Sequence, residues 1–230
     1  MIKISIIIPV FNEASRIEKL INYLENTLFF KDDVEIVVVD GGSTDGTQNK
    51  IMQTENLKLI QAEKGRAKQM NAGAKRAKGD LLYFLHCDSY PPQHFDRLIS
   101  EAVQRRNLAG CFRMKFDYAH PVLFVSQWFT RFNHISCRGG DQSLFITKDL
   151  FEEIKGFDEH YIIYEDNEIV SRLYSKRQFV VLAENIITSA RRYRHNGVWN
   201  LQYHFSIIHL KRRLGHSAES MLQYYKKNVR

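Results

Sequence analysis

The 230-residue chain suits one domain with a substantial core, and its 44% hydrophobic and 26% charged residues are typical of soluble globular proteins. No stretch reaches the roughly 20 apolar residues of a membrane span, and the apolar run interrupted by Pro9 is too short for a signal peptide. The net charge of +7 favours anionic partners, among which nucleic acid, anionic lipid and nucleotide diphosphates all qualify.

Two further features of the sequence bear on the cellular location of the protein and on its binding partners. The three cysteines, Cys87, Cys111 and Cys137, are odd in number and show no paired spacing, which predicts reduced thiols in a cytoplasmic protein. No nucleic-acid-binding module is recognisable, and the aromatic residues mostly lie in apolar runs rather than between basic residues. We therefore do not expect nucleic acid as a partner.

The first predicted strand covers residues 3–9, whose nearly continuous isoleucine run is typical of a parallel strand buried on both faces. Asn12 is expected to cap the helix that follows. The core-facing stripe of this helix, at helical spacing, consists of Ile17, Leu20, Ile21 and Leu24.

A second predicted strand, 35–39, leads into Asp40, two glycines and Ser43, which is expected to cap a helix over 43–53. Asp40 then lies at the carboxyl end of a strand, where open α/β sheets bind ligands, and Gly41 allows a close backbone approach. The same residues are equally good turn chemistry without any ligand. The phosphate-loop and dinucleotide fingerprints both fail here, because their lysine and glycine positions are not matched.

Strands and helices keep alternating up to about Gly110, which predicts an α/β fold with a doubly wound, mostly parallel sheet. In this part, strands are expected over 57–61 and 80–86 and a helix over 65–74. Beyond it, strands are expected over 111–116, 143–147, 179–182 and 186–189, and helices over 122–132, 165–176 and most of 198–230.

The strand over 80–86 is followed by Cys87 and Asp88. If this tip stays extended, His86 and Asp88 point the same way, and the carboxylate can hold a hard divalent cation. The alternative is that Asp88 only begins a turn and that His86 is an ordinary strand-end histidine. Asp40 at another strand end of the same sheet favours the metal site.

A third cluster, Tyr164-Glu165-Asp166, opens the helix over 165–176 and follows the glycine turn 156–159. Paired acids at a helix start commonly serve only the helix dipole. A carboxylate lifted to the sheet rim by the turn can instead act as a general base, and both interpretations stand at this point.

Together these segments resemble glycosyltransferase family 2, whose members have the GT-A nucleotide-sugar transferase fold. The matching segments are Ile-Ile-Ile-Pro-Val-Phe-Asn-Glu (6–13), Val-Val-Val-Asp-Gly-Gly-Ser-Thr-Asp-Gly-Thr (37–47), the Asp88 strand end, Gly-Phe-Asp-Glu (156–159) and Glu165-Asp166. The resemblance covers residues 1 to about 190. The run Gly-Arg-Ala-Lys-Gln-Met-Asn-Ala-Gly-Ala (65–74) is further similar to a bacterial subgroup without membrane spans.

The resemblance implies a site for a nucleoside-diphosphate sugar, with Asp40 recognising the base or ribose. The other residues that it places around the donor are Pro9, Phe11, Glu13, Gly41, Arg66 and Asn71. A basic cluster follows the last predicted strand and fits a lid over the diphosphate as well as a solvated charge run. It consists of Arg191, Arg192, Arg194 and His195.

The resemblance also implies Mn²⁺ or Mg²⁺ as cofactor, bound to the diphosphate by Asp88, the second acid of the family's Asp-x-Asp. His86 stands where the first acid belongs, a departure whose imidazole suits Mn²⁺ better than Mg²⁺. Asp166, with Glu165 as the alternative, would deprotonate an acceptor hydroxyl, so an inverting, metal-dependent glycosyltransferase is expected. A nucleotidylyltransferase and a nucleotide-sugar-binding protein without turnover are the competing hypotheses.

We expect a catalytic domain over 1–195, with its donor half at about 1–110 and its acceptor half at about 110–195, and a helical appendage over 196–230. The appendage has an apolar stripe closed by the basic run 211–213; the stripe consists of Val198, Leu201, Phe205 and Ile208. Such a stripe can contact the inner face of a membrane, which would suit a lipid-linked acceptor. It can equally pack on the catalytic domain or in a homodimer, and core packing is the commoner use.

Overall fold

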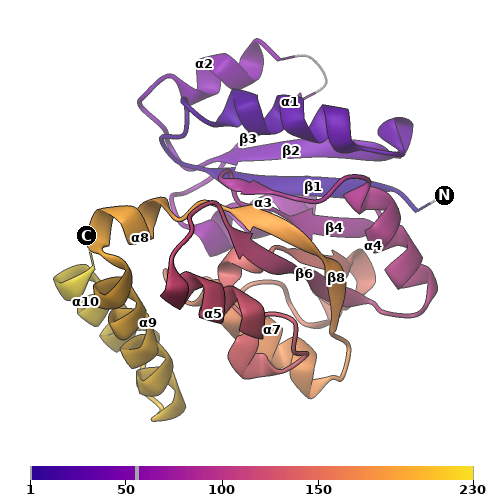
Figure 1. The fold of residues 1–230 in the computed structure, drawn as a ribbon. Coiled ribbons are helices and arrows are strands. Elements are labelled where there is room, and N and C mark those ends of the chain that lie inside the picture. The colour runs from indigo at the N-terminus through magenta and orange to yellow at the C-terminus, as the bar shows by residue number, and fades with distance from the viewer. Residues whose placement is uncertain (1, 55–56, 230) are drawn as a thin grey trace.

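The computed structural model describes residues 2–54 and 57–229, which form an eight-stranded sheet with helices on both faces (Figure 1). The strands are β1 (Ile4–Val10), β2 (Val34–Asp40), β3 (Leu57–Gln61), β4 (Leu81–Phe84), β5 (Ser89–Tyr90), β6 (Ala109–Phe116), β7 (Leu144–Thr147) and β8 (Val180–Thr188). Their order is β3-β2-β1-β4-β7-β6-β8-β5. β7 runs antiparallel to both neighbours, whereas β1, β2, β3 and β4 are parallel. The predicted doubly wound, mostly parallel sheet is confirmed.

The helices cover both faces of this sheet because alternate residues of β1 point to opposite sides. Ile4, Ile6 and Ile8 pack in one core with α1 and α4, and Ile7 packs in a second core with α3, α6 and α7. The predicted stripe of α1 is buried in the first core. The helices are α1 (Ile17–Thr27), α2 (Thr47–Met52), α3 (Arg66–Arg76), α4 (Phe95–Gln104), α5 (Pro121–Phe129), α6 (Lys148–Glu153), α7 (Glu165–Ser175), α8 (Arg191–Asn196), α9 (Val198–Arg213) and α10 (Ala218–Asn228), with 3₁₀ turns η1 (Lys31–Asp33), η2 (Ile135–Cys137) and η3 (Gly140–Gln142).

The two predicted helix caps are wrong. α1 begins at Ile17 and α2 at Thr47, and neither helix has a side-chain cap. Asn12 and Ser43 instead join the loops after β1 and β2: the Asn12 amide donates to Ser43 Oγ at 2.9 Å, and the Thr44 amide donates to Asn12 Oδ1 at 2.9 Å. Their polar groups therefore connect two strand ends rather than two helix starts.

The predicted extended tip after β4 is also different. β4 ends at Phe84, and Cys87 and Asp88 form a turn that leads directly into β5. The Ser89 amide donates to the His86 carbonyl at 3.1 Å, which closes this turn. The alternation argument for His86 and Asp88 therefore does not hold.

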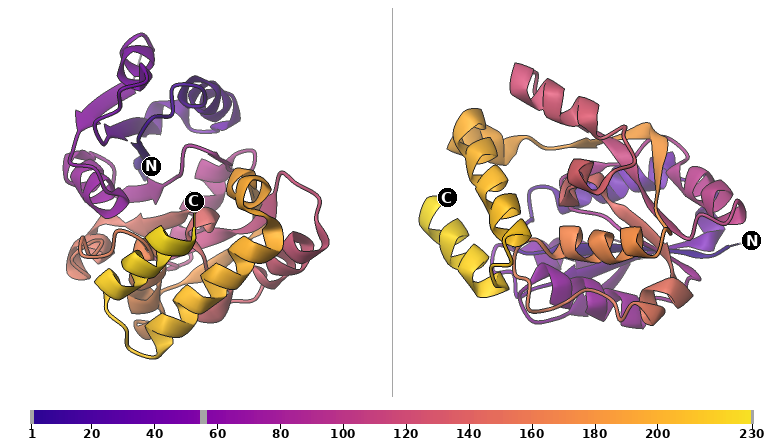
Figure 2. Two further views of the ribbon diagram at one scale, coloured as in Figure 1. Left: turned by 90° about the vertical axis from the view of Figure 1, so that its left-hand side faces the viewer. Right: turned by 90° about the horizontal axis from the view of Figure 1, so that it is seen from below.

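The C-terminal part contains one strand where two were expected, because β8 runs without a break from Val180 to Thr188. Its pairing with β6 shifts register between Phe112 and Arg113, which accommodates extra residues of β8 at a bulge. Figure 2 shows α9 and α10 side by side against one flank of the body.

The apolar stripe of α9 packs on the body rather than facing outward. Val198, Leu201 and Ile208 are buried, and the first two share a core with Phe116 and Tyr193. Packing, the commoner use of such a stripe, is what the structure shows. Among residues 2–54 and 57–229, no helix has the length and apolar character needed to cross a bilayer.

Candidate active site

Asp40 is the last residue of β2, as expected, but its side chain is fully buried. Its Oδ2 accepts hydrogen bonds from the Gly42 and Ser43 amides, both at 3.0 Å, and from Gln48 Nε2 at 2.7 Å; Ser43 Oγ donates to Oδ1. This is the arrangement that the turn interpretation predicts. The carboxylate holds the 40–48 loop, and its contact with a nucleoside stays a prediction.

Gln69, which sequence reasoning missed, joins the ends of β1 and β2. Its Nε2 donates to the Val10 and Val39 carbonyls, both at 2.8 Å, and the side chain is buried. A Cβ on Gly41 would lie 3.1 Å from the Gln69 amide atoms, so the glycine leaves room for this contact. Gly41 thus serves the packing of the strand ends.

Asn71 has a similar structural place, on the same helix. Its Nδ2 donates to the Phe157 carbonyl and to Glu159 Oε1, and its Oδ1 accepts from the Phe157 amide, all at 2.9 Å. The residue therefore fixes the glycine turn 156–159 in front of α7 and does not line either cavity described below.

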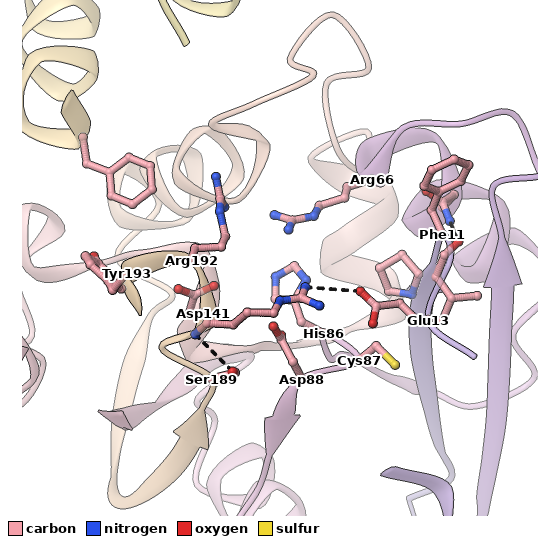
Figure 3. Close-up of a pocket in the computed structure, with 15 residues that line it drawn as sticks. Phe11, Glu13, Arg66, His86, Cys87, Asp88, Asp141, Ser189, Arg192 and Tyr193 are labelled. Atoms are coloured by element: carbon pink, nitrogen blue, oxygen red, sulfur yellow. Dashed lines mark hydrogen bonds and ion pairs between the residues drawn. The ribbon is translucent and has the colours of Figure 1, made fainter. Parts of the chain in front are cut away.

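A cavity of about 200 Å³ lies where the ends of β1 and β4 meet the start of α8 (Figure 3). Eight predicted site residues line it: Pro9, Phe11, Glu13, Arg66, His86, Asp88, Arg191 and Arg192. The lining residues that were not predicted include Gln69, Asp141, Ser189 and Tyr193. Asp40, Gly41, Asn71 and His195 lie outside it.

The predicted base, Asp166, lies within reach of this cavity through His86. Its Oδ2 is 3.5 Å from His86 Nε2, and the neighbouring Glu165 Oε1 is 3.5 Å from Arg66 Nη1. Three segments distant in sequence therefore meet here: the start of α3, the turn after β4 and the start of α7. The glycine turn places the acids at the sheet rim, as expected.

The two adjacent acids titrate differently. Burial raises the pKa of Glu165 to about 7, with the Asp166 charge adding to the effect and Arg66 opposing it. Burial also acts on Asp166, but the bond to His86 and the charges of His86 and Arg66 lower the pKa of this carboxyl. Asp166 is therefore the acid that stays ionised near neutral pH.

Gly140 allows Asp166 to sit beside the 139–142 loop. A Cβ on Gly140 would lie 2.2 Å from Asp166 Oδ2, whereas a Cβ on Gly139 would meet nothing within 4 Å. A side chain at Gly140 would therefore require Asp166 to move, whereas a side chain at Gly139 would not.

Asp88 and Asp141 present their carboxylates to the smaller cavity, where Figure 3 shows them near His86. Burial raises the pKa of Asp141, as does the Asp88 charge, while His86 and Arg66 oppose this. Among the described residues, neither carboxylate has a hydrogen-bond or ion-pair partner, and no three acid, histidine or cysteine side chains are arranged to hold a metal. Two free carboxylates fit a hard divalent cation only if a ligand supplies further oxygens.

Asp141 was not predicted as a site residue. The signal was the Gly-Gly-Asp-Gln run before β7, which repeats the combination of glycine and acid seen after β2. His86 was predicted as a metal ligand, but its ring is paired with Asp166, and a metal-binding role for it stays a prediction.

The basic cluster divides between the cavity and the surface. Arg191 lies 3.5 Å from Glu13 Oε1, and Arg192 donates to the Tyr225 hydroxyl on α10. Arg194 pairs with Asp117 at 3.1 Å, and His195 is exposed. Only the first two arginines line the cavity, so the cluster does not act as one unit.

A second cavity, of about 1000 Å³, shares five lining residues with the first, namely Arg66, Asp141, Arg192, Tyr193 and Phe205. Glu165 and Asp166 line it at that end. Its remaining wall is largely apolar and comes from β6, α5, α9 and α10, with Met114, Phe116, Phe129, Ile208, Leu222 and Tyr225 among the lining residues. The C-terminal helices are therefore part of the wall of this cavity.

Known proteins are similar to this chain in sequence and in fold. The family described as "Glycosyl transferase family 2" matches residues 5–153. The glycosyltransferase AglE of Haloferax volcanii is 28% identical over 199 residues, which cover 80% of this chain and 65% of that protein. The chain thus spans just under two thirds of that relative's length.

Two solved structures share the fold. TarS 1–349 of Staphylococcus aureus, in complex with UDP, has a TM-score of 0.68 at 22% identity and covers 82% of this chain and 60% of that one. The mannosyltransferase PcManGT of Pyrobaculum calidifontis, in complex with GDP-Man and Mn²⁺, has a TM-score of 0.70 at 17% identity and covers 97% of this chain and 68% of that one.

The raised pKa of Glu165 predicts a pH dependence of stability. An unfolded glutamate ionises near pH 4.3, before the folded one, so the free energy of unfolding should fall as the pH rises from about 4.5 to 8. The side chain of Glu165→Gln cannot ionise, so its free energy of unfolding should lack this fall. Between about pH 4.5 and 8 the stability of the variant relative to the wild type should therefore rise by roughly 1–3 kcal/mol. Urea unfolding at several pH values measures it.

The exposed Glu25→Gln serves as the control and should follow the wild-type curve. Parallel curves for the wild type and Glu165→Gln would contradict the assignment of a buried, proton-binding Glu165.

Proposed function

Because the chain belongs to glycosyltransferase family 2 and has a GT-A fold, we propose that it transfers a sugar from a nucleoside diphosphate to an acceptor hydroxyl with inversion. The observation that carries this proposal is the meeting of the two cavities at Arg66, Asp141 and Arg192, with Asp166 at the junction. A displacement reaction needs two substrates that meet at a base.

We assign the diphosphate end of the donor to the smaller cavity. At about 200 Å³ it is below the roughly 300–1000 Å³ typical of whole ligand sites, so the nucleoside would extend along the open rim near Phe11. UDP and GDP-Man are ligands of the structural neighbours, which supports this class of donor. The larger cavity is assigned to the acceptor.

In the proposed reaction Asp166 accepts the proton of the acceptor hydroxyl. The acceptor oxygen forms a bond to the anomeric carbon while the bond from that carbon to the diphosphate oxygen breaks, and the electron pair leaves with the nucleoside diphosphate. His86 and Arg66 keep Asp166 ionised, and Arg191 and Arg192 face the departing charge. Ionised Asp166 is the better base because Glu165 is buried against Arg66.

A divalent cation, Mn²⁺ or Mg²⁺, fits the free carboxylates of Asp88 and Asp141, with Asp141 supplying the acid that His86 replaces in the Asp-x-Asp. When bound, such an ion would neutralise charge on the diphosphate. The neighbour bound to GDP-Man and Mn²⁺ supports this cofactor.

The test is a panel of nucleotide sugars measured by thermal shift with and without Mn²⁺, because a bound ligand stabilises the folded protein. Release of nucleoside diphosphate in the presence of an acceptor would then establish transfer. Release of pyrophosphate would indicate a nucleotidylyltransferase, and binding with no release under any metal would indicate a protein without turnover.

Asp166→Asn keeps the size of the side chain and removes the base. Turnover should fall on the order of 10²- to 10⁴-fold, with donor-induced stabilisation nearly intact. Glu165→Gln, measured alongside, should lose much less. The opposite pattern would make Glu165 the base.

Asp88→Ala should remove the dependence of nucleoside-diphosphate binding on Mn²⁺. Calorimetric titration of UDP and GDP with and without the metal measures this directly, independent of turnover. The exposed Asp32→Ala is the control and should bind as the wild type does. Metal-enhanced binding that persists in Asp88→Ala would contradict the assignment.

Gly140→Ala should displace the Asp166 carboxylate, because the added methyl group would lie 2.2 Å from Oδ2. We expect turnover to fall about tenfold or more while donor binding is kept, since small misplacements of a base are costly. Gly139→Ala, which meets open space, should behave as the wild type. Equal turnover of the two variants would show that the base lies elsewhere.

A further inference from the structure

Helix α5 is attached to the protein by its polar side chains. Gln127 Oε1 accepts from the Phe116 amide at 2.9 Å, and Thr130 Oγ1, just past the helix end, accepts from the Met114 amide at 3.1 Å. Both amides belong to the part of β6 that extends beyond its pairing with β7. Leu123 is the buried residue of the helix.

The apolar side chains of α5 consequently face outward. Phe124, Val125, Trp128 and Phe129, with Phe132 just after the helix, are between 40% and 62% exposed. Trp128 contacts Phe129 and Phe132 at ring-centroid distances of 5.4 and 5.1 Å, and the Arg131 guanidinium lies 4.6 Å from the Trp128 ring centre. A helix on a water-soluble body normally has the opposite polarity, with its apolar side toward the core. We call these five residues the aromatic face.

Two arginines lie next to this face: Arg131 against the Trp128 ring, and Arg213, which bonds to Ser136 just beyond α5. Residues 118–140 and 185–218 contain eight lysines and arginines and no aspartate or glutamate, whereas the net charge of the whole chain is +7. The rest of the chain is therefore close to neutral. The second of these segments includes α9, whose basic end reaches the turn η2 that follows α5: Arg213 Nη2 donates to Ser136 Oγ at 2.8 Å.

Helix α9 has exposed apolar residues of its own. Trp199, Tyr203, Leu210 and Leu214 are at least half exposed and recur at i, i+4, i+11 and i+15, which places them on one side of the helix. This side is distinct from the buried stripe of Val198 and Leu201. The larger cavity lies between the two helices, since Phe129 of α5 and Leu210 of α9 both line it.

We propose that the aromatic face inserts into the interface of a membrane containing anionic lipid. Exposed tryptophan and phenylalanine beside arginine match the depth profile of such an interface, with rings below the headgroups and bases at the phosphates. The proposal goes beyond the transfer reaction and holds whether or not that assignment is correct. It replaces the buried α9 stripe with α5 as the membrane-contacting element.

A second copy of the chain fits this face less well. A symmetric dimer would bring Arg131 and Arg213 of the two copies toward each other, and these like charges oppose such contact. Nucleic acid also fits less well, because binding to it relies on several basic side chains among the rings. The aromatic face instead includes the aliphatic Val125, and Arg131 lies against its Trp128 ring. Anionic lipid satisfies both the apolar and the basic parts.

The experiment is sedimentation with vesicles of phosphatidylcholine alone or mixed with phosphatidylglycerol, at low and high salt. The wild type should bind the mixed vesicles, and less so as salt rises. Phe124→Ser combined with Trp128→Ser should weaken binding about tenfold or more. Phe29→Ser is the matched control, because Phe29 is 48% exposed with Arg97 5.3 Å above its ring but lies away from α5; it should bind as the wild type does.

The two tryptophans of the chain allow a second readout. In Trp199→Phe the remaining Trp128 should shift its emission to shorter wavelength with mixed vesicles and be quenched by brominated lipid. No vesicle binding, or equal binding of the double variant, would overturn the proposal. So would a dimer or an oligonucleotide complex that depends on the aromatic face.

Discussion

Two adjacent carboxylates at the start of α7, the buried Glu165 and the half-buried Asp166, constrain the site more than any other feature. Ionised groups lose their hydration when they are buried, so each needs a partner. Arg66 on α3 stands opposite Glu165, and His86 after β4 stands opposite Asp166. The fold must therefore bring a helix start, a strand end and another helix start within a few ångströms of one another, and the glycine turn held by Asn71 makes this possible.

The elements that depend on local pattern were predictable. The β-branched runs of β1 and β2 and the stripe of α1 follow from burial on a regular repeat, which a sequence displays directly. The helix caps were not predictable, because Asn12 and Ser43 bond to each other across 31 residues of the sequence. A short polar side chain before a helix looks the same in the sequence whether it bonds to the helix or to a distant segment. β8 was split in the prediction because its bulge interrupts the alternation.

The site was predictable to the extent that family motifs mark it. The motif residues Glu13 and Asp88 line the smaller cavity, but Asp40, the most conspicuous acid, is buried under its own loop. Asp141 and Gln69 were not predicted as site residues, because their roles come from the tertiary structure. Asp141 faces the cavity from a turn far along the chain, and Gln69 joins two strand ends. A glycine–acid run before a strand was the only sign of Asp141.

The shared wall of the two cavities has a consequence for affinity. Arg66, Asp141 and Arg192 face both spaces, so a ligand that neutralises or displaces any of them in one cavity alters the field felt in the other. Such coupling is reciprocal by thermodynamic necessity: whatever factor the first ligand applies to the affinity of the second, the second applies to the first. Two substrates that meet at this wall therefore alter each other's affinity by the same factor.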